Sequence, residues 1–177
     1  VEVLRFHTDA YLRAVKGLSR GDASVDAAAF SFGPGDNPVY EGMYEAAALS
    51  SGATMRAVEL IASGEVGAAF NIAGGLHHAM PGYASGFCVF NDVGVAGKLL
   101  LETKEVRRVA VIDCDVHHGD GTALIFRYDP RVFTASLHCE QNWPREKPPS
   151  DLDIGLPKGT GDADYLAALE DLVEAAL

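Results

Sequence analysis

The sequence lacks the features that mark several classes of protein. Its three cysteines, Cys88, Cys114 and Cys139, show no CxxC spacing, which argues against both a disulfide framework and a thiolate zinc site. Every apolar stretch is interrupted by Gly, His or a charged residue before it could cross a bilayer, and no basic segment precedes an apolar one at the start. We therefore expect a cytoplasmic protein without a membrane segment.

Basic residues are scarce as well. Lys and Arg number 14 against 25 Asp and Glu, which gives a formal net charge of −11, and no long Lys/Arg run occurs. Direct nucleic-acid binding is not expected from this balance, whereas a cationic or neutral substrate is easily accommodated. With 48% apolar residues in 177, one globular α/β domain over residues 1–177 is the default expectation. The oligomeric state stays open.

Apolar periodicity predicts alternating helices and strands. Thr8 is a suitable N-cap for a short helix that ends near Leu18, and a longer helical pattern covers residues 40–62. Predicted strands at 67–72, 108–113 and 131–137 alternate with helical segments at 92–104 and 121–128, and a last helical pattern covers 164–177. Because these strands are continuously apolar, they are typical of a parallel sheet between helices, so we predict a three-layer αβα fold with a mainly parallel sheet.

Polar clusters follow the predicted strands. They read GGLHHA at residues 74–79, DCDVHHGD at 113–120 and SLH at 136–138, so five of the six histidines come just after a strand. In open parallel sheets the functional loops gather at the carboxyl ends of the strands. We therefore expect a functional site at this edge of the sheet.

The second cluster has the spacing of a metal site. Asp115 and His117 stand two apart, so in an extended segment both side chains project from one side and can share a metal, and a mixed Asp/His set suits zinc. Asp113 points the same way and either binds a metal or accepts a hydrogen bond from a neighbouring imidazole. Asp120 is suited to that second role for another histidine.

The first cluster suits proton transfer. His77 and His78 supply imidazoles that titrate near neutrality, as acid and base chemistry on a metal-bound water requires. For Asp36, a solvated loop carboxylate and a substrate-binding residue are equally good interpretations. Phe87 would ordinarily be assigned to the core, and only its place after the histidine pair suggests a channel wall. His7 and His138 lie outside the two clusters that contain paired histidines, and structural roles are expected for both.

The motifs together resemble those of the zinc-dependent histone deacetylase family, including bacterial acetoin-utilisation-type deacetylases and acetylpolyamine amidohydrolases. The matching segments are GGLHHA at 74–79, GFCVFND at 86–92, IDCDVHHGDGT at 112–122 and, at a rim loop, GDNPVYEG at 35–42. The resemblance runs from about Phe6 to the end of the chain. It implies an arginase/deacetylase-like fold and hydrolysis of acetylated amines, with acetyl-lysine of proteins as the first expectation.

The resemblance also implies a role for each matching position. Asp115 and His117 would be zinc ligands. His77 and His78 would be the tandem acid/base histidines, with Asp113 and Asp120 as their carboxylate partners. Gly86 and Phe87 would line the acyl-lysine tunnel, and Asp36 would hold the substrate backbone at the rim.

A monovalent cation, usually potassium, accompanies zinc in this family. Its ligands would be the Asp113 carboxylate, the Ser136 hydroxyl and main-chain oxygens at Asp113, Asp115, His117 and Leu137. Hard oxygen ligands suit such an ion.

The sequence departs from the family pattern in one respect. The family's third zinc ligand, a later aspartate, and its transition-state tyrosine have no counterpart before Leu177. Catalytic zinc normally has three protein ligands. We expect that residues 1–177 form a single deacetylase domain truncated before its C-terminal strands, that the natural protein continues, and that this chain alone is inactive.

Other functions stay open at this point. An acetylpolyamine or another small acyl amine would fit a narrow tunnel as well as acetyl-lysine does. A non-catalytic binding module that keeps the fold is a second alternative, given the missing ligands. A binuclear manganese ureohydrolase of related fold is a third, but the histidine pair and the GFC segment count against it.

Overall fold

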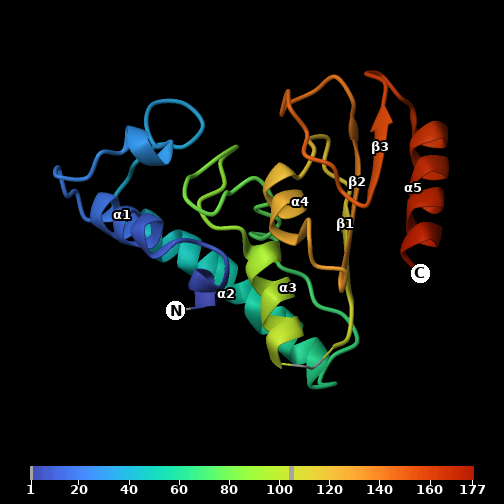
Figure 1. Cartoon of the computed structure of the whole chain (residues 1–177), viewed down its shortest axis with the longest axis horizontal. Helices are drawn as coiled ribbons and strands as arrows, with labels where there is room; N and C mark the ends of the chain where they lie inside the picture. Colours follow the sequence, from blue (N-terminus) through green and yellow to red (C-terminus); the bar gives the residue numbers. More distant parts are fainter. Residues whose placement is uncertain (1, 104–105) are drawn as a thin grey trace. The chain divides into compact units, whose positions relative to one another are not determined.

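The computed structural model describes residues 2–103 and 106–177, which form two compact units divided between Val106 and Arg107 (Figure 1). The first unit contains η1 (Glu2–Arg5), α1 (Asp9–Ser19), η2 (Ala28–Phe30), α2 (Met43–Ala62) and α3 (Asp92–Thr103). The second contains β1 (Val109–Asp113), α4 (Asp120–Phe126), β2 (Val132–Cys139), β3 (Leu152–Leu156) and α5 (Asp162–Ala176). Within the described ranges, no helix has the length and apolar character to cross a membrane.

The helix α1 begins where the sequence predicts. Thr8 is extended, and its hydroxyl accepts the N–H of Tyr11 at 3.2 Å, an N-cap that contributes about 1 kcal/mol. The buried face of α1 belongs to a core cluster shared with α2 and with the segment before α3. Its buried members are Val3, Tyr11, Leu12, Val15, Leu18, Phe32, Met43, Ala47, Ala84 and Phe90.

The long helix α2 starts three residues later than its pattern predicts. Gly42 precedes it with φ of +83°, a left-handed conformation that glycine adopts without strain and that a helix cannot contain. Met43, the first helical residue, is completely buried. Residues 40–42 thus form the turn that precedes the helix, in which the Met43 N–H donates to the Tyr40 carbonyl at 3.3 Å.

The predicted strand at 67–72 is wrong. This segment forms no strand, and Phe70 and Ile72 are 89% and 90% exposed. A strand needs a neighbour to take its backbone hydrogen bonds. In the described part of the first unit the only bridge of this kind joins Ser85 and Cys88, so apolar character alone did not produce a strand here.

The second unit contains a parallel sheet in the order β1-β2-β3. β1 and β2 were predicted within two residues of their observed ends, and β2 runs on to Cys139, so His138 lies inside the strand rather than after it. β3 was not predicted. Its sequence alternates apolar residues with Asp153 and Gly155, a pattern that lacks the continuous apolar run of a buried strand.

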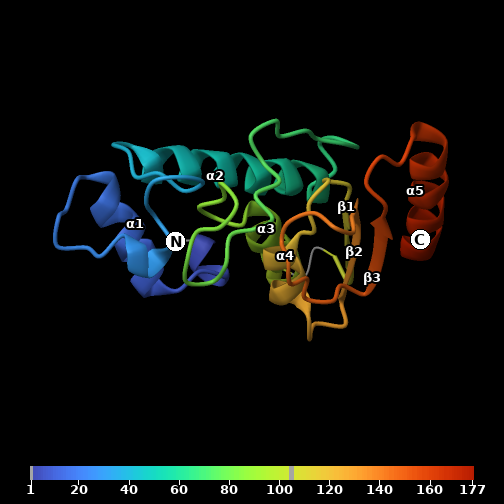
Figure 2. The ribbon, with the colours of Figure 1, turned by 90° about the horizontal axis from the view of Figure 1, so that it is seen from above.

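The two faces of β2 explain the layering of this unit. Phe133, Ala135 and Leu137 alternate onto one face, where they pack in a cluster with α5 and its completely buried Leu172. The opposite face meets α4, and Figures 1 and 2 show α4 and α5 on either side of the strands. The predicted three-layer arrangement around a parallel sheet is confirmed in this unit.

A buried histidine braces the first unit. His7 is 2% exposed, and its Nδ1 donates to the Met80 carbonyl at 3.0 Å while its Nε2 accepts the Asn91 N–H at 2.9 Å. This pattern requires the neutral imidazole with its proton on Nδ1. Burial lowers the pKa of His7 to about 4, in keeping with the structural role expected of it.

In the second unit a buried histidine connects two segments of the chain through a hydrogen bond. His118 is completely buried, its Nε2 lies 3.1 Å from Oδ1 of Asp153 on β3, and its Nδ1 has no hydrogen-bond partner among the described residues. Burial by itself would raise the pKa of Asp153, but hydrogen bonds from His118 and Ser150 outweigh it and lower that pKa. The loop after β1 is thereby tied to β3.

The His7 interactions predict a pH-dependent stability. The folded protein holds His7 neutral, whereas the unfolded chain protonates it below about pH 6.5. The contribution of His7 to the free energy of unfolding is therefore complete above that pH. It is lost as the pH falls toward about 4, and the loss is on the order of 3 kcal/mol. In urea unfolding at several pH values, His7→Phe should be less stable than the wild type at neutral pH but should lose less stability on acidification. Parallel losses in both proteins would contradict this.

The His118–Asp153 pair predicts a strong stability effect. Asp153→Ala leaves a completely buried imidazole without its carboxylate partner, which should lower the free energy of unfolding by about 2 to 3 kcal/mol. Glu146→Gln, which removes a carboxylate from an exposed position in the same unit, should change it by less than about 0.5 kcal/mol. Both variants can be compared by chemical denaturation. Equal stability of the two would show that the contact between His118 and Asp153 does not hold the loop.

Candidate functional site

The histidine pair lies in the long loop between α2 and α3. His77 and His78 are buried, at 8% and 4% exposure, and their ring centroids are 3.9 Å apart with planes inclined by 50°. Two imidazoles in such close contact share one environment. The pair is thus a preformed feature of the first unit.

Asn91 fixes the backbone of this pair. Its side-chain amide donates to the carbonyls of His77 and Ala79 at 3.2 and 3.3 Å, and its Oδ1 accepts the Gly94 N–H at 2.8 Å in the first turn of α3. Sequence reasoning gave Asn91 no role. The available signal was its place in the GFCVFND segment, directly before the helix.

The predicted channel residue Phe87 is on the surface. It is 74% exposed, which rules out the core interpretation, and its φ of +67° is rare for a residue with a large side chain. Such conformations gather at functional sites. Gly86 before it also has positive φ, and the Phe87 N–H donates to Oδ1 of Asn37 at 3.1 Å. Since Asp36 is exposed beside Asn37, the three predicted substrate residues lie in one region of the first unit.

The predicted zinc ligands come together in the second unit. Oδ1 of Asp115 accepts the backbone N–H of His117 at 2.7 Å and lies 2.9 Å from Nδ1 of the same ring. Asp113 accepts the Asp115 N–H at 3.0 Å. The sequence argument assumed an extended segment, whereas the structure joins the pair through a turn in which each aspartate accepts the N–H two residues on.

The donor set of this pair suits zinc. A carboxylate oxygen and an imidazole nitrogen converge, and both side chains keep 39% to 49% of their surface exposed, so an ion can reach them. Among residues 2–103 and 106–177 no group of three or more His, Cys, Asp or Glu side chains is placed to hold a metal. Asp115 and His117 therefore fit two of the protein ligands of a catalytic zinc.

The predicted monovalent-cation residues are neighbours in the sheet. Asp113 and Ser136 are paired in the parallel register of β1 and β2, and Ser136 and Leu137 are buried at 2% and 1% exposure. The Ser136 hydroxyl lies 3.0 Å from Nδ1 of His138, whose pKa is lowered by burial and by the neighbouring His118. The ligand role of these residues stays a prediction.

Asp120 is buried at 6% exposure in the first turn of α4, where its Oδ1 accepts the Gly121 N–H at 2.9 Å. Asp113 and Asp120 were predicted to serve the His77–His78 pair. That assignment also stays a prediction.

Trp143 was missed by sequence reasoning. Its ring centroid is 6.2 Å from that of His117 with planes at 74°, and it is 42% exposed. The signal was its being the single tryptophan of the chain, placed in the Pro-rich segment 143–149. An exposed aromatic ring therefore stands beside the predicted zinc ligand.

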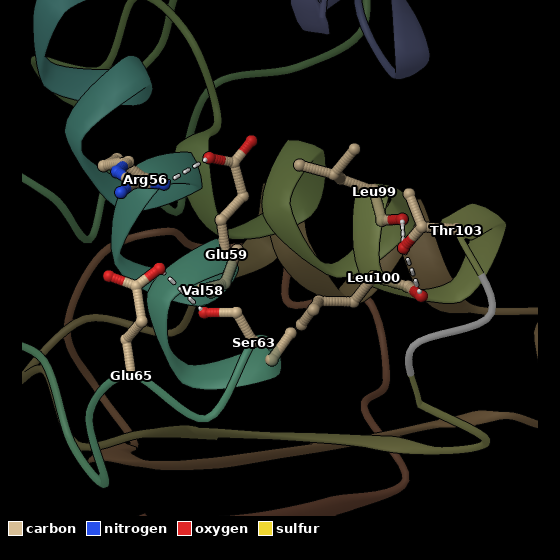
Figure 3. A pocket seen from close by; sticks show the side chains of 9 residues that line it. Arg56, Val58, Glu59, Ser63, Glu65, Leu99, Leu100 and Thr103 are labelled. Atoms are coloured by element: carbon tan, nitrogen blue, oxygen red, sulfur yellow. Dashed lines mark hydrogen bonds and ion pairs between the residues drawn. The ribbon is translucent and has the colours of Figure 1, made fainter.

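Each of the two units has a hollow in its surface. One hollow, of about 280 Å³, lies against α2 and α3 (Figure 3). Its two glutamates accept hydrogen bonds, Glu59 from Arg56 at 3.3 Å and Glu65 from Ser63 at 3.3 Å. It contains no histidine or cysteine. The other, of about 470 Å³, lies at the carboxyl ends of the strands in the second unit and includes Cys114 and His138. Only the second belongs to the edge of the sheet that carries the predicted zinc ligands.

Comparison with known proteins places these features in a family. The family model of the histone deacetylase domain matches residues 1–177. The acetoin utilization protein AcuC of Bacillus subtilis (strain 168) is 42% identical over 138 residues, 77% of this chain and 35% of that protein. Histone deacetylase 8 of Xenopus laevis is 41% identical over 159 residues, 89% of this chain and 48% of that protein.

A solved structure is similar to this chain over nearly its whole length. An HDAC homolog from Aquifex aeolicus matches with a TM-score of 0.86 and 34% identity, over 98% of this chain and 50% of that one. This chain thus spans half or less of the length of these three relatives. The likeness confirms the arginase/deacetylase-like fold and the resemblance seen in the motifs. The chain belongs to the histone deacetylase family.

Proposed function

We propose that the natural protein is a zinc-dependent deacetylase that hydrolyses acetylated amines, acetyl-lysine of proteins first among them, to acetate and the free amine. The observation that carries this proposal is the Asp115–His117 pair, a carboxylate and an imidazole that converge at 2.9 Å at the end of β1. Membership of the histone deacetylase family supports the reaction class.

Asp115 and His117 would hold the zinc, which supplies polarisation of the acetyl carbonyl and acidification of the attacking water. The His77–His78 pair moves the protons: one imidazole takes a proton from the water, and the other gives one to the leaving amine. Their burial supports this assignment, because a pair shielded from bulk water exchanges protons with the substrate rather than with solvent. Asp113 and Asp120 are proposed to accept hydrogen bonds from these rings and raise their basicity.

The substrate is proposed to meet the first unit at Phe87. The exposed ring would cover the methylene stem of acetyl-lysine, Gly86 would let the backbone approach it closely, and the Asp36 carboxylate would accept a backbone N–H of the peptide. The net charge of −11 favours a peptide rich in lysine.

Potassium is the second proposed cofactor, with a structural role. The Asp113 carboxylate, the Ser136 hydroxyl and the main-chain oxygen of Leu137 would be among its ligands. The pairing of Asp113 with Ser136 in the sheet supports this set, since both belong to adjacent positions of neighbouring strands.

The chain is further proposed to be the N-terminal part of one cytoplasmic deacetylase domain. Its match to 35% to 50% of the length of its relatives supports this, because the remaining length can supply the third zinc ligand and a transition-state tyrosine. The chain of 177 residues alone would then show no zinc-dependent turnover.

Metal content and turnover of the full-length protein test this function. We expect one zinc per chain, loss of acetyl-lysine peptide turnover on chelation and its recovery with zinc. Acetylated polyamines assayed beside the peptide identify a preference for small amines. Two manganese ions per chain would indicate a ureohydrolase, and a metal-free, inactive protein would support a binding module instead.

The histidine pair gives a second prediction. His78→Ala in the full-length protein should lower kcat by at least about a hundredfold, because it removes a proton-transfer group, while zinc content stays the same. Glu65→Gln, an exposed change in the same unit, should leave kcat unchanged. Turnover of His78→Ala at the wild-type rate would refute the role given to the pair.

A further inference from the structure

A buried carboxylate stands beside the histidine loop and has no part in the mechanism above. Asp92, in the first turn of α3, is 1% exposed. It accepts the Leu76 N–H at 2.7 Å, the Gly75 N–H at 3.1 Å and the Thr54 hydroxyl at 2.5 Å. Two of its three donors are the backbone amides directly before His77.

The donors behind Asp92 form a chain with one direction. Nδ2 of Asn71 donates to Oγ1 of Thr54 at 2.7 Å, and the Thr54 hydroxyl in turn donates a hydrogen bond to Asp92. The same Asn71 nitrogen donates to the Ser50 carbonyl at 3.0 Å. Both oxygens of Asp92 accept, Oδ1 from Leu76 and Oδ2 from Gly75 and Thr54, so this position needs two acceptor oxygens without a proton.

The loop backbone at Gly74 packs closely against these side chains. A Cβ added at Gly74 would lie 2.6 Å from Oδ2 of Asp92, 2.8 Å from Oγ1 of Thr54 and 2.9 Å from Nδ2 of Asn71. The backbone at Gly74 therefore lies directly against this network, and only glycine allows the approach.

Asn91, the residue before Asp92, forms hydrogen bonds with the same histidine loop. Asn91 bonds the carbonyls of His77 and Ala79, while Asp92 bonds the amides of Gly75 and Leu76. Two consecutive side chains at the start of α3 thus fix the loop before, within and after the histidine pair.

We propose that Asp92 is a positioning residue for proton transfer, which acts by fixing the Gly75–Leu76 backbone and so the orientation of His77 and His78. Thr54, on α2, holds the Asp92 carboxylate in place through the hydrogen bond from its hydroxyl. This inference rests on the proposed role of the histidine pair. It assigns to Asp92 a requirement for a carboxylate, because both of its oxygens accept hydrogen bonds in this loop.

Asp92→Asn and Thr54→Val in the full-length protein test this. Oδ2 of Asp92 accepts from Gly75 and Thr54 while Oδ1 accepts from Leu76, and the single side-chain oxygen of Asn cannot serve both places. Asp92→Asn should therefore lower kcat by about tenfold to a hundredfold, with KM within about twofold and zinc content unchanged. Thr54→Val, which keeps the volume and loses the hydroxyl, should show a smaller loss in the same direction. Thr54→Ser, which keeps the hydroxyl, should have the kcat of the wild type.

Ser19→Ala is the matched control. Ser19 is 3% exposed, donates to Glu45 at 3.0 Å and accepts the Tyr44 N–H at 3.1 Å, so its loss removes comparable buried bonds from the same unit away from the histidine loop. It should destabilise the protein but keep kcat and the pH profile of kcat. Asp92→Asn should change that pH profile, because the surroundings of the two imidazoles change.

Amide hydrogen exchange separates this inference from the proposed function. Exchange over residues 74–80 should rise in Asp92→Asn and not in Ser19→Ala. A wild type without turnover would refute the deacetylase proposal, and the exchange result would still decide the positioning role. Wild-type kcat, pH profile and exchange in folded Asp92→Asn, or equal losses in Ser19→Ala, would overturn the role of Asp92.

Discussion

Buried backbone amides and carbonyls in irregular segments need side-chain partners, because no helical turn or neighbouring strand supplies them. The loops that carry the predicted chemistry are segments of this kind. In the first unit His7, Asn91 and Asp92 provide the partners for residues 75–80, and in the second unit His118 anchors its loop through Asp153. The position of the chemical groups therefore depends on buried polar side chains that do no chemistry themselves.

β2 has a comparable role among the regular elements. It pairs with β1 on one side and β3 on the other, and its two faces alternate between an apolar surface under α5 and a surface that includes Ser136 and His138. A slip of one residue would exchange these faces and turn Leu137 toward the polar side. The same register that buries the α5 cluster thus also sets Ser136 opposite Asp113.

The sequence predicted elements whose causes are local. Thr8 identified the start of α1, and helical periodicity located α2, α3, α4 and α5. It failed for residues 67–72, because strand formation depends on a partner that periodicity does not reveal. It missed β3, whose alternating pattern differs from the continuous apolar runs by which the other strands were predicted. In the site, residue types and spacing pointed to the histidine pair and to Asp115 and His117. Asn91, Asp92 and Trp143 were identified from contacts across 12 to 38 residues of sequence, which spacing does not encode.

The conformation and exposure of Phe87 have an energetic consequence for the protein. A phenylalanine with φ of +67° costs about 1 kcal/mol in backbone conformation, and 74% exposure leaves its ring in water. The fold tolerates both penalties because Asn37 and the Ser85–Cys88 bridge hold the turn. A molecule that covers the ring removes the second penalty without any rearrangement of the chain. In the proposed role of Phe87, part of the affinity for an apolar stem would come from removing this unfavourable hydration.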